Sequence, residues 1–276
     1  MILFPAIDLV GGRVVRLANG DRARMDVYSD SPASVARDFL ARGASWVHVV
    51  DLSSALGEDE AAREANAQAI RAICQVEGLS VDAGGGVRSI DAMRRLADLG
   101  VRRIAIGTAL VRNPAFARQA ASEFGDMAVA DVAAKDGVVR VNGWREGGSL
   151  AADDLVSSLA EMGFRHLVFT DIARDGMQTG VDPTAYRHIA EVAGFPVVAS
   201  GGIASVDDVR ALAALGPQVV EGCITGRALY EGALTLEDAG SDQTHVDGVS
   251  GATFTSNAVV GCLNIAFEAY AQLGGN

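Results

Sequence analysis

Three aspartates supply the side chains best suited to move protons. Asp8 and Asp131 each end a short apolar run, and Asp175 lies in the glycine-containing segment TDIARDGMQTG (170–180). The sequence shows no zinc-ligand spacing, no GxSxG elbow and no Cys–His pair, so carboxylates are the available acid and base. An acid and a base on opposite sides of a substrate suit ring opening followed by proton abstraction beside an imine, which needs no metal or cofactor. One Asp must then keep its proton near neutral pH, as a desolvated site can arrange.

Glycine-rich segments on both sides of these aspartates are candidate phosphate sites. Gly201 and Gly202 follow one apolar run, and Gly226 and Arg227 follow the next, in TGRAL (225–229). Glycine lets the backbone approach an anion closely, the start of the next helix attracts negative charge, and an arginine adds a charge-assisted hydrogen bond. The alternative is that these glycines only form turns. Repetition of both segments earlier in the chain favours phosphate binding.

The earlier copies are GGGVRS (84–89) and IGTAL (106–110). Their candidate ligand-binding residues are Gly86, Arg88, Gly107 and Thr108. Two anion sites on opposite sides of one catalytic centre imply a small substrate that is phosphorylated at both ends.

The elements that position these residues come in two matching halves. The matched segments are GGVRSIDAMRRLADLG (85–100) with GGIASVDDVRALAALG (201–216), VVDL (49–52) with FTDI (169–172), GTAL (107–110) with GRAL (226–229), and Asp8 upstream of GGRVVRL with Asp131 upstream of KDGVVRV. Because four landmarks recur in the same order, the chain consists of two homologous halves of about four βα units each.

Eight short apolar runs predict eight strands, at 2–8, 46–51, 79–84, 102–107, 127–131, 166–171, 196–201 and 218–226. Helical patterns lie between them, and those at 31–43, 89–100 and 205–216 open on a serine cap signal and end in glycine. Eight strands alternating with helices predict an α/β fold, a (βα)8 barrel with its reactive residues at the carboxyl ends of the strands. We expect the barrel over residues 1–240 and a C-terminal appendage with one helix over 241–276.

Bulk properties exclude several classes of partner. The chain has 276 residues and a formal charge of −12, which argues against binding nucleic acid or an anionic membrane. Its three cysteines form no CxxC pair, the N-terminus is unlike a signal peptide, and no apolar run approaches the ~18 residues of a membrane helix. These features predict a cytoplasmic enzyme, which we expect to be a monomer.

The motifs together resemble those of the histidine-biosynthesis isomerase family, which converts a phosphoribosylformimino-aminoimidazole carboxamide ribotide from aminoaldose to aminoketose. The resemblance runs from residue 1 to about 240 and rests on PAIDLVGGRVVRL, HVVDL, GGGVRS, IGTAL, GW, TDIARDG and ASGGIAS. It implies an Amadori rearrangement with no cofactor. The related cyclase family of the same pathway shares the half-barrel repeat, but PAID and TDIARDG resemble the isomerase form.

The resemblance also implies a role for each matching residue. Asp8 would be the general base that takes the C2 proton, and Asp175 the general acid that protonates the ring oxygen. Asp131 and Thr170 would line the reacting centre, while Arg16 and Trp144 would hold or cover the substrate. The phosphates would lie on Gly86 and Thr108 at one end and on Gly202 and Arg227 at the other. Further expected substrate contacts are Arg88, Gly107, Gly176, Gly201 and Gly226.

Three positions depart from the family pattern. GVD (180–182) replaces the usual Gly-Pro-Asn after the sixth strand, and DLSSALG (51–57) replaces a commoner Asp-Gly or Asp-Ala exit from the second. A dual-substrate form of the family also isomerises phosphoribosylanthranilate and carries an arginine two residues before the tryptophan of its fifth loop, where this chain has Asn142. Dual specificity therefore stays open as an alternative.

The C-terminal segment carries a second resemblance. DGVSGATFTS (247–256) is similar to the acceptor motif of flavin-binding domains in membrane redox complexes, where a flavin transferase attaches FMN to the motif's threonine. By that resemblance Thr253 would be the acceptor and a flavin transferase a partner. The alternative is a fusion remnant or an added tag, and since the rearrangement needs no redox group we favour it for function.

Two hypotheses of different class follow. The first is the isomerase, and the second is a non-catalytic phosphosugar-binding barrel with a flavinylated tail. The set of three aspartates favours the first, because a binding protein gains little from carboxylates beside a bisphosphorylated ligand. We interpret His48 as a packed strand residue, and Asp51 and Asp171 as helix caps or loop braces.

Overall fold

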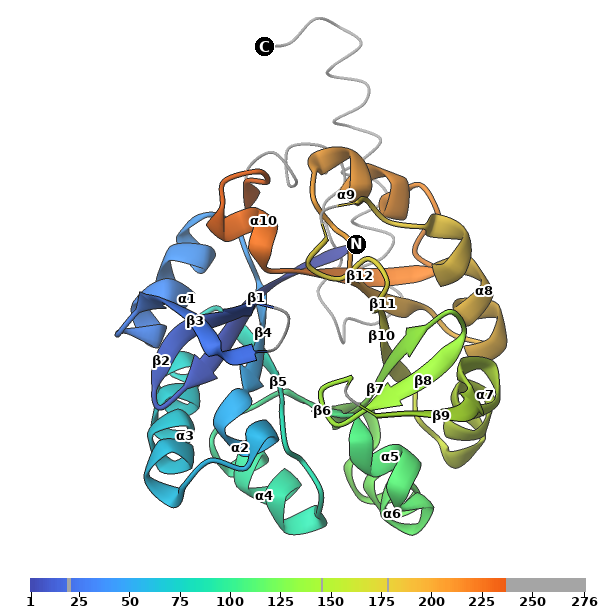
Figure 1. The fold of residues 1–276 in the computed structure, drawn as a ribbon, viewed down its shortest axis with the longest axis horizontal. Coiled ribbons are helices and arrows are strands. Elements are labelled where there is room, and N and C mark those ends of the chain that lie inside the picture. The colour runs from blue at the N-terminus through green and yellow to red at the C-terminus, as the bar shows by residue number, and fades with distance from the viewer. Residues whose placement is uncertain (19–20, 145, 178, 237–276) are drawn as a thin grey trace, which may run out of the picture. The chain divides into compact units, whose positions relative to one another are not determined.

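The chain folds into a closed barrel of parallel strands, shown in Figure 1. This computed structural model describes residues 1–18, 21–144, 146–177 and 179–236. In order around the ring, the barrel strands are β1 (Ile2–Val10), β4 (Trp46–Asp51), β5 (Ser80–Gly84), β6 (Arg103–Ile106), β7 (Ala128–Lys135), β10 (His166–Asp171), β11 (Val197–Ser200) and β12 (Val220–Thr225). Pairing of β12 with β1 and of β7 with β10 closes the ring, so the (βα)8 prediction is confirmed.

Helices surround the barrel in Figure 1 and connect successive strands. They are α1 (Pro32–Ala41), α2 (Leu52–Leu56), α3 (Glu60–Cys74), α4 (Ile90–Asp98), α5 (Thr108–Arg112), α6 (Pro114–Phe124), η1 (Gly125–Met127), α7 (Ala152–Met162), α8 (Pro183–Ala193), α9 (Val206–Ala213) and α10 (Arg227–Tyr230). The serine caps expected for α4 and α9 are present, through Ser89 and Ser205. The one expected for α1 is wrong, because Ser31 makes no side-chain cap hydrogen bond and Pro32 opens that helix.

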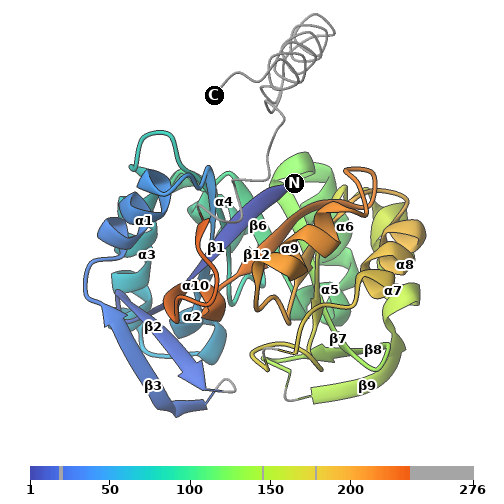
Figure 2. The same cartoon turned by 90° about the horizontal axis from the view of Figure 1, so that it is seen from above.

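Two strand pairs extend the barrel at equivalent places, and the apolar runs had not predicted them. β2 (Arg13–Ala18) runs antiparallel to β1 and pairs with β3 (Asp21–Ser29). β8 (Val138–Val141) runs antiparallel to β7 and pairs with β9 (Glu146–Ala151). Figure 2 shows both pairs at the same end of the barrel. Each half therefore carries the same insertion after its first strand, which agrees with the internal repeat.

The opposite end of the barrel is closed by apolar packing and an ion network. Phe4 packs there with Val129, Val168 and Val198, all almost fully buried. Glu221 of β12 accepts a hydrogen bond from Arg103 of β6 at 2.6 Å and lies 3.1 Å from Nδ1 of His166 on β10. Because the interior is filled at this end, a ligand can enter only from the end that carries the carboxyl termini of the strands.

The chain divides after Leu236 into two units, and the second, Glu237–Asn276, lies outside the described residues. The expected tail, its helix and Thr253 therefore lie outside them as well. In the described part of the chain, no helix is both long and apolar enough to cross a lipid bilayer.

Candidate active site

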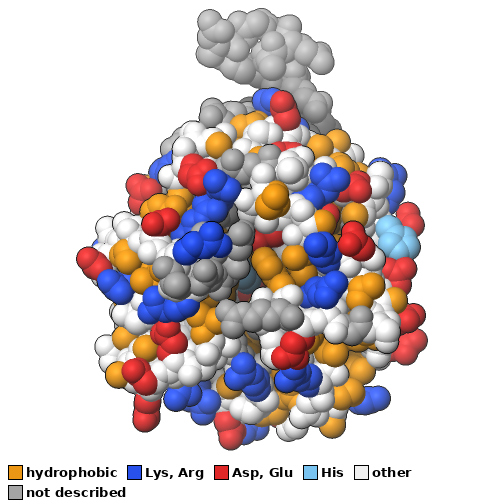
Figure 3. Space-filling view, viewed as in Figure 1, with side chains coloured by type: hydrophobic (Ala, Val, Ile, Leu, Met, Phe, Trp, Pro, Cys, Tyr) orange, Lys and Arg blue, Asp and Glu red, His pale blue; other side chains and the backbone are white. Residues whose placement is uncertain are grey.

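A pocket of about 790 Å³ opens at the carboxyl end of the barrel. Figure 3 shows its mouth as a hollow near the centre of this face, with basic and apolar side chains around it. All the site residues expected from the sequence within the described part of the chain line this one pocket, namely Asp8, Arg16, Gly86, Arg88, Gly107, Thr108, Asp131, Trp144, Thr170, Asp175, Gly176, Gly201, Gly202, Gly226 and Arg227. The roles assigned to them stay predictions.

Three carboxylates reach the pocket from different sides of the barrel. Asp8 comes from β1, Asp131 from β7 across the barrel, and Asp175 from the loop after β10. Burial, together with the charge of Asp175, raises the pKa of Asp8 to about 6, while His48 and Arg16 act in the opposite direction. Burial is also the main cause that raises the pKa values of Asp131 and Asp175. The site therefore holds one carboxyl group, Asp8, that can exchange a proton close to neutral pH, and two others whose pKa values are shifted in the same direction.

The loop that carries Asp175 is braced by Asp171, the last residue of β10. The Asp171 carbonyl accepts hydrogen bonds from the backbone N–H groups of Arg174 at 3.2 Å and Asp175 at 3.0 Å. Its carboxylate accepts one from Ala173 N–H at 3.0 Å and lies 3.4 Å from Nε of Arg174. Asp171 thus holds the loop in shape, as expected for a loop brace.

Two arginines at the pocket rim converge on a single carboxylate oxygen. Arg16 of β2 and Arg227 of α10 contact Oε1 of Glu231 at 3.1 Å and 2.7 Å. Arg227 also donates a hydrogen bond to the Gly176 carbonyl at 2.7 Å, in the loop that bears Asp175. The rim therefore links the two expected substrate-binding arginines to the loop of the expected acid.

The paired glycine turns make equivalent close contacts in the two halves. A Cβ on Gly85 would overlap the Asp51 carbonyl, and one on Gly201 would overlap the Asp171 carbonyl. Gly86 and Gly202 also have positive φ, at 69° and 87°. The Cβ position of Gly86 is taken by Ser54 of α2, and that of Gly202 by the loop after β10. These turns must therefore be glycine for steric reasons alone, and that requirement is compatible with an anion lying against them.

Short helices begin at the other two glycine segments. Gly107 precedes α5 with φ −106° and ψ −101°, and Gly226 precedes α10 with φ −121° and ψ −82°. The hydroxyl of Thr108 accepts a hydrogen bond from Asn142 N–H at 3.0 Å, which connects α5 to the β8–β9 hairpin. In barrels of this kind, such helix starts beside the final strands are common phosphate sites.

Comparison with known proteins agrees with this geometry. A family model described as "Histidine biosynthesis protein" matches residues 2–235. The chain belongs to this family.

Among its relatives in the family, a protein of Rhizorhabdus wittichii is 46% identical over 239 residues, covering 87% of this chain and 97% of the relative. One of Anaeromyxobacter dehalogenans is 44% identical over 239 residues, covering 87% and 98%. One of Hahella chejuensis is 40% identical over 251 residues, covering 91% and 100%. All three are named 1-(5-phosphoribosyl)-5-((5-phosphoribosylamino)methylideneamino)imidazole-4-carboxamide isomerase.

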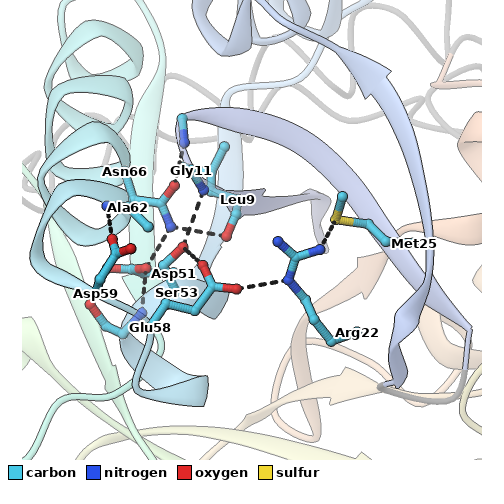
Figure 4. Close-up of polar contacts among 12 residues, drawn as sticks. Leu9, Gly11, Arg22, Met25, Asp51, Ser53, Glu58, Asp59, Ala62 and Asn66 are labelled. Atoms are coloured by element: carbon cyan, nitrogen blue, oxygen red, sulfur yellow. Dashed lines mark hydrogen bonds and ion pairs between the residues drawn. The ribbon is translucent and has the colours of Figure 1, made fainter.

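The unusual exit from the second barrel strand, a departure from the family pattern, is explained by the polar network in Figure 4. Asp51 accepts hydrogen bonds from Ser54 N–H at 2.9 Å and from the Asn66 side chain at 2.6 Å. Asn66 in turn donates to the Leu9 carbonyl and accepts from Gly12 N–H. The Ser53 hydroxyl accepts from Gly11 N–H and donates to Glu58. Asp51 is thus a cap, as predicted, and the network fixes the turn at Gly11 and Gly12, which follows the strand that carries Asp8.

The altered segment after β10, another departure from the family pattern, is also satisfied locally. Asp208 of α9 accepts a hydrogen bond from Val181 N–H at 3.0 Å, and Asp182 caps α8 through Thr184 N–H at 3.0 Å. The Gly180 carbonyl accepts from Arg174 at 3.2 Å. GVD therefore keeps the loop joined to both neighbouring helices.

His48 and Arg140 are among the polar side chains of the pocket that the sequence analysis did not assign to the site. His48 of β4 lines its floor, where the sequence had indicated only a packed residue. Arg140 of β8 lines its wall, and its Nε is buried without a hydrogen-bond partner among the described residues. Gly147 on β9 leaves the space for that guanidinium, since a Cβ there would overlap it. For His48 a signal was present as alternation, because it stands two residues from Val50, another pocket-lining residue of β4. For Arg140 there was none, because consecutive residues of β8 line the pocket.

The tryptophan of the β8–β9 connection lies in a conformation that few side chains adopt. Trp144 has φ +68° and is 40% exposed at the pocket mouth. Asn142, with φ +54°, donates from its side chain to Glu146 at 2.5 Å. Non-glycine residues with positive φ are uncommon and concentrate at functional sites. This family member therefore presents a large aromatic surface from a strained connection beside its pocket.

Proposed function

We propose that this protein catalyses the aminoaldose-to-aminoketose isomerisation for which its relatives are named. The observation that carries the proposal is that Asp8 and Asp175, from opposite halves of the barrel, line one pocket between two pairs of glycine segments. A substrate with a phosphoribosyl group at each end can bind one phosphate in each half and present its aminoaldose between the carboxyl groups.

In the proposed first step, Asp175 donates a proton to the ring oxygen of the aminoaldose. The C1–O bond breaks as the nitrogen lone pair forms a C1=N imine, so the ring opens without change in oxidation state. Burial is the main cause that raises the pKa of Asp175, which is the direction that a general acid needs. The hydrogen bonds that the Asp171 carbonyl accepts from this loop, and the contact between Arg227 and Gly176, support its placement.

In the proposed second step, Asp8 removes the C2 proton and the electrons of that bond form an enamine. Reprotonation at C1 and loss of the O2 proton give the aminoketose, so atoms and electrons balance within the substrate. A base with a pKa of about 6 is ionised at neutral pH yet binds a proton readily. Proton transfer is sufficient for this chemistry, so the protein's own carboxyl groups provide the required catalysis.

Phosphate binding is proposed at both pairs of glycine segments. Gly86 and Thr108 would hold one phosphate, and Gly202 with Arg227 the other, with Arg88, Gly107, Gly201 and Gly226 alongside. The matched geometry of the two halves supports this assignment. Arg16, Thr170 and Trp144 are proposed to contact the middle of the substrate.

A coupled assay with the carboxamide ribotide tests the function directly. We expect turnover by the unmodified chain and its loss, with substrate binding kept, in Asp8→Asn and in Asp175→Asn. Absence of turnover by the correctly folded chain would overturn the proposal. A phosphosugar-binding barrel without catalysis would bind the ribotide and return it unchanged.

Cytoplasmic location and a monomeric state are further parts of this proposal. Flavinylation of Thr253 by a transferase is the prediction of the second resemblance, with a fusion remnant or tag as its alternative. Intact mass after co-expression with a flavin transferase tests the last point. A species heavier by one FMN supports it, and an unchanged mass contradicts it.

A further inference from the structure

His48 points into the barrel at the floor of the pocket. It lies in the middle of β4, where its backbone pairs with Ala6 of β1 on one side and Asp82 of β5 on the other. Paired residues of adjacent strands face the same side of a sheet, and Ala6 and His48 both line the pocket. Since Ala6 and the nearby Ala105 are small, the imidazole has space beneath the carboxylates.

Asp82 is the closest charged partner of this imidazole. His48 Nδ1 lies 3.6 Å from Asp82 Oδ1, and the two residues are 8% and 2% exposed. Among the described residues, neither atom has a hydrogen-bond partner. A carboxylate so deeply buried is costly unless a positive charge lies beside it, so the contact favours the imidazolium form.

Other charges around His48 act in the same direction. Asp82 on β5, Asp131 on β7 and Asp8 on β1 each raise the pKa of His48, and together they outweigh the effect of its burial. The pKa is raised above its usual value as a result. His48 therefore differs from an ordinary packed histidine, which would be neutral and hydrogen-bonded.

The positive charge acts in turn on the carboxyl groups. His48 lowers the pKa values of both Asp8 and Asp131, against the effect of their burial. The other groups that face Asp8 are Arg16 of β2, Asp175 of the loop after β10 and the Tyr230 hydroxyl of α10. Asp82 also faces Asp131. Arg16 also forms an ion pair with Glu231 at the pocket rim. His48, inside the barrel, acts on both Asp8 and Asp131.

We propose that His48 is a positioning residue, which holds a positive charge beneath Asp8 and Asp131 with Asp82 as its counter-ion and so keeps the base ionised at neutral pH. This inference rests on the proposed function, in which Asp8 is the base. His48 acts through Asp8 and transfers no proton to the substrate.

The test is the pH dependence of kcat/KM for His48→Gln, which keeps a polar side chain and removes the charge. We expect the acidic limb to move upward by about one pH unit, because an opposite charge at close range shifts a carboxyl pKa by about one to three units. At pH 6 the variant should then lose activity several-fold more than at pH 8. A limb that stays in place, with activity reduced equally at every pH, would show a packing role and overturn the proposal.

His166→Gln is the matched control. His166 also contacts a partly buried acidic group, Glu221, but at the opposite end of the barrel and outside the pocket lining. Its removal should leave the acidic limb where it is. Asp82→Asn should raise the limb as His48→Gln does, and the double variant should raise it no further, since both changes remove the same charge. Additive shifts would contradict the assigned pair.

NMR titration of the imidazole separates this proposal from the proposed function. With ring-labelled histidine, the His48 signal should titrate above pH 6.5 in the unmodified protein and lower in Asp82→Asn. That result requires no turnover and no folded His48→Gln variant. If the ribotide is not converted, the proposed function fails while the titration still reports the charge. A His48 ring that is neutral at pH 6.5 overturns the inference in either case.

Discussion

Arg227 donates a hydrogen bond to the carbonyl oxygen of Gly176 at 2.7 Å, which joins the start of α10 to the loop that bears Asp175. The same guanidinium contacts Glu231, as does Arg16. At this side of the pocket mouth, Arg227, which is proposed to bind a phosphate, is linked to the loop that bears Asp175. Through Glu231 it is also linked to Arg16 of the β2–β3 hairpin. Binding of a phosphate at Arg227 would act on the acid's loop directly.

Replacing Glu231 by Gln tests this linkage. The change keeps the side-chain size but removes the charge that holds both arginines, so we expect KM to change several-fold with kcat altered less. Charge-assisted hydrogen bonds are worth roughly 1.5–3 kcal/mol each, so an effect of that order is measurable. Steady-state kinetics at low and high ionic strength measures it. Unchanged KM at both ionic strengths would argue against a role for the linkage in substrate binding.

The pH profile of the unmodified enzyme follows from Asp8. Because burial raises the pKa of Asp8 to about 6, the base is ionised above that pH and protonated below it. We expect kcat/KM to be roughly constant from about pH 7 to 8 and to fall about tenfold between pH 7 and pH 5. Measuring kcat/KM across this range checks it, and a limb near pH 4 would mean that Asp8 is not desolvated in the working enzyme.

Asp8→Asn should stabilise the fold while it abolishes turnover. The pKa of Asp8 is higher in the folded chain than its ordinary value of 3.8, so ionisation opposes folding as pH rises from 3.8 to about 6. At pH 7 the free energy of unfolding should therefore increase by about 1–3 kcal/mol on replacement by Asn. At pH 3.5 the difference should nearly vanish, because the wild-type carboxyl is then mostly protonated in both states. Denaturant unfolding at the two pH values makes the comparison.

Much of this fold could be predicted from sequence because barrel strands are short, apolar and buried on both faces. The runs at 46–51 and 166–171 match β4 and β10 in full. The hairpins β2–β3 and β8–β9 could not, since their edge strands are mixed in polarity and their pairing is set by the barrel strands beside them. His48 is a buried strand residue, as expected, but its charged surroundings could not be predicted for a related reason. Its significance depends on Asp82, which strand register places beside it and spacing along the chain does not reveal.

Gly201 offers a test of the steric requirement at the paired glycine turns. Its φ is +89° and an added Cβ would overlap the Asp171 carbonyl, which cannot move without displacing the Asp175 loop. We expect Gly201→Ala to destabilise the protein by about 2–4 kcal/mol. Gly216 is the matched control, because it has φ +84° with no atom within 4 Å of its Cβ position. Its replacement by Ala should cost only about 1 kcal/mol. If Gly201→Ala and Gly216→Ala lowered the stability measured by thermal unfolding equally, the close contact with the Asp171 carbonyl would have no role.

We expect the ability to use phosphoribosylanthranilate as a second substrate to depend on the side chains of the β8–β9 hairpin. Asn142 stands where the dual-substrate form carries an arginine, and its side chain is held by Glu146. A carboxylate-bearing phosphoribosylanthranilate would therefore lack a contact worth roughly 1.5–3 kcal/mol. We expect its kcat/KM to be at least about tenfold below that for the carboxamide ribotide, measured in parallel assays.

We expect Arg140 to provide part of the binding of phosphoribosylanthranilate that Asn142 cannot. Arg140 lines the pocket wall, so its guanidinium is a candidate partner for an anionic substrate group. If anthranilate turnover is detected, Arg140→Ala should remove it while it raises KM for the carboxamide substrate by a smaller factor, since only the anthranilate adds a carboxylate. Arg165→Ala is the control, because that arginine contacts backbone carbonyls far from this pocket. An equal effect of Arg140→Ala on both substrates would show that it contacts a group they share, such as a phosphate, and would place the discrimination at Asn142 instead.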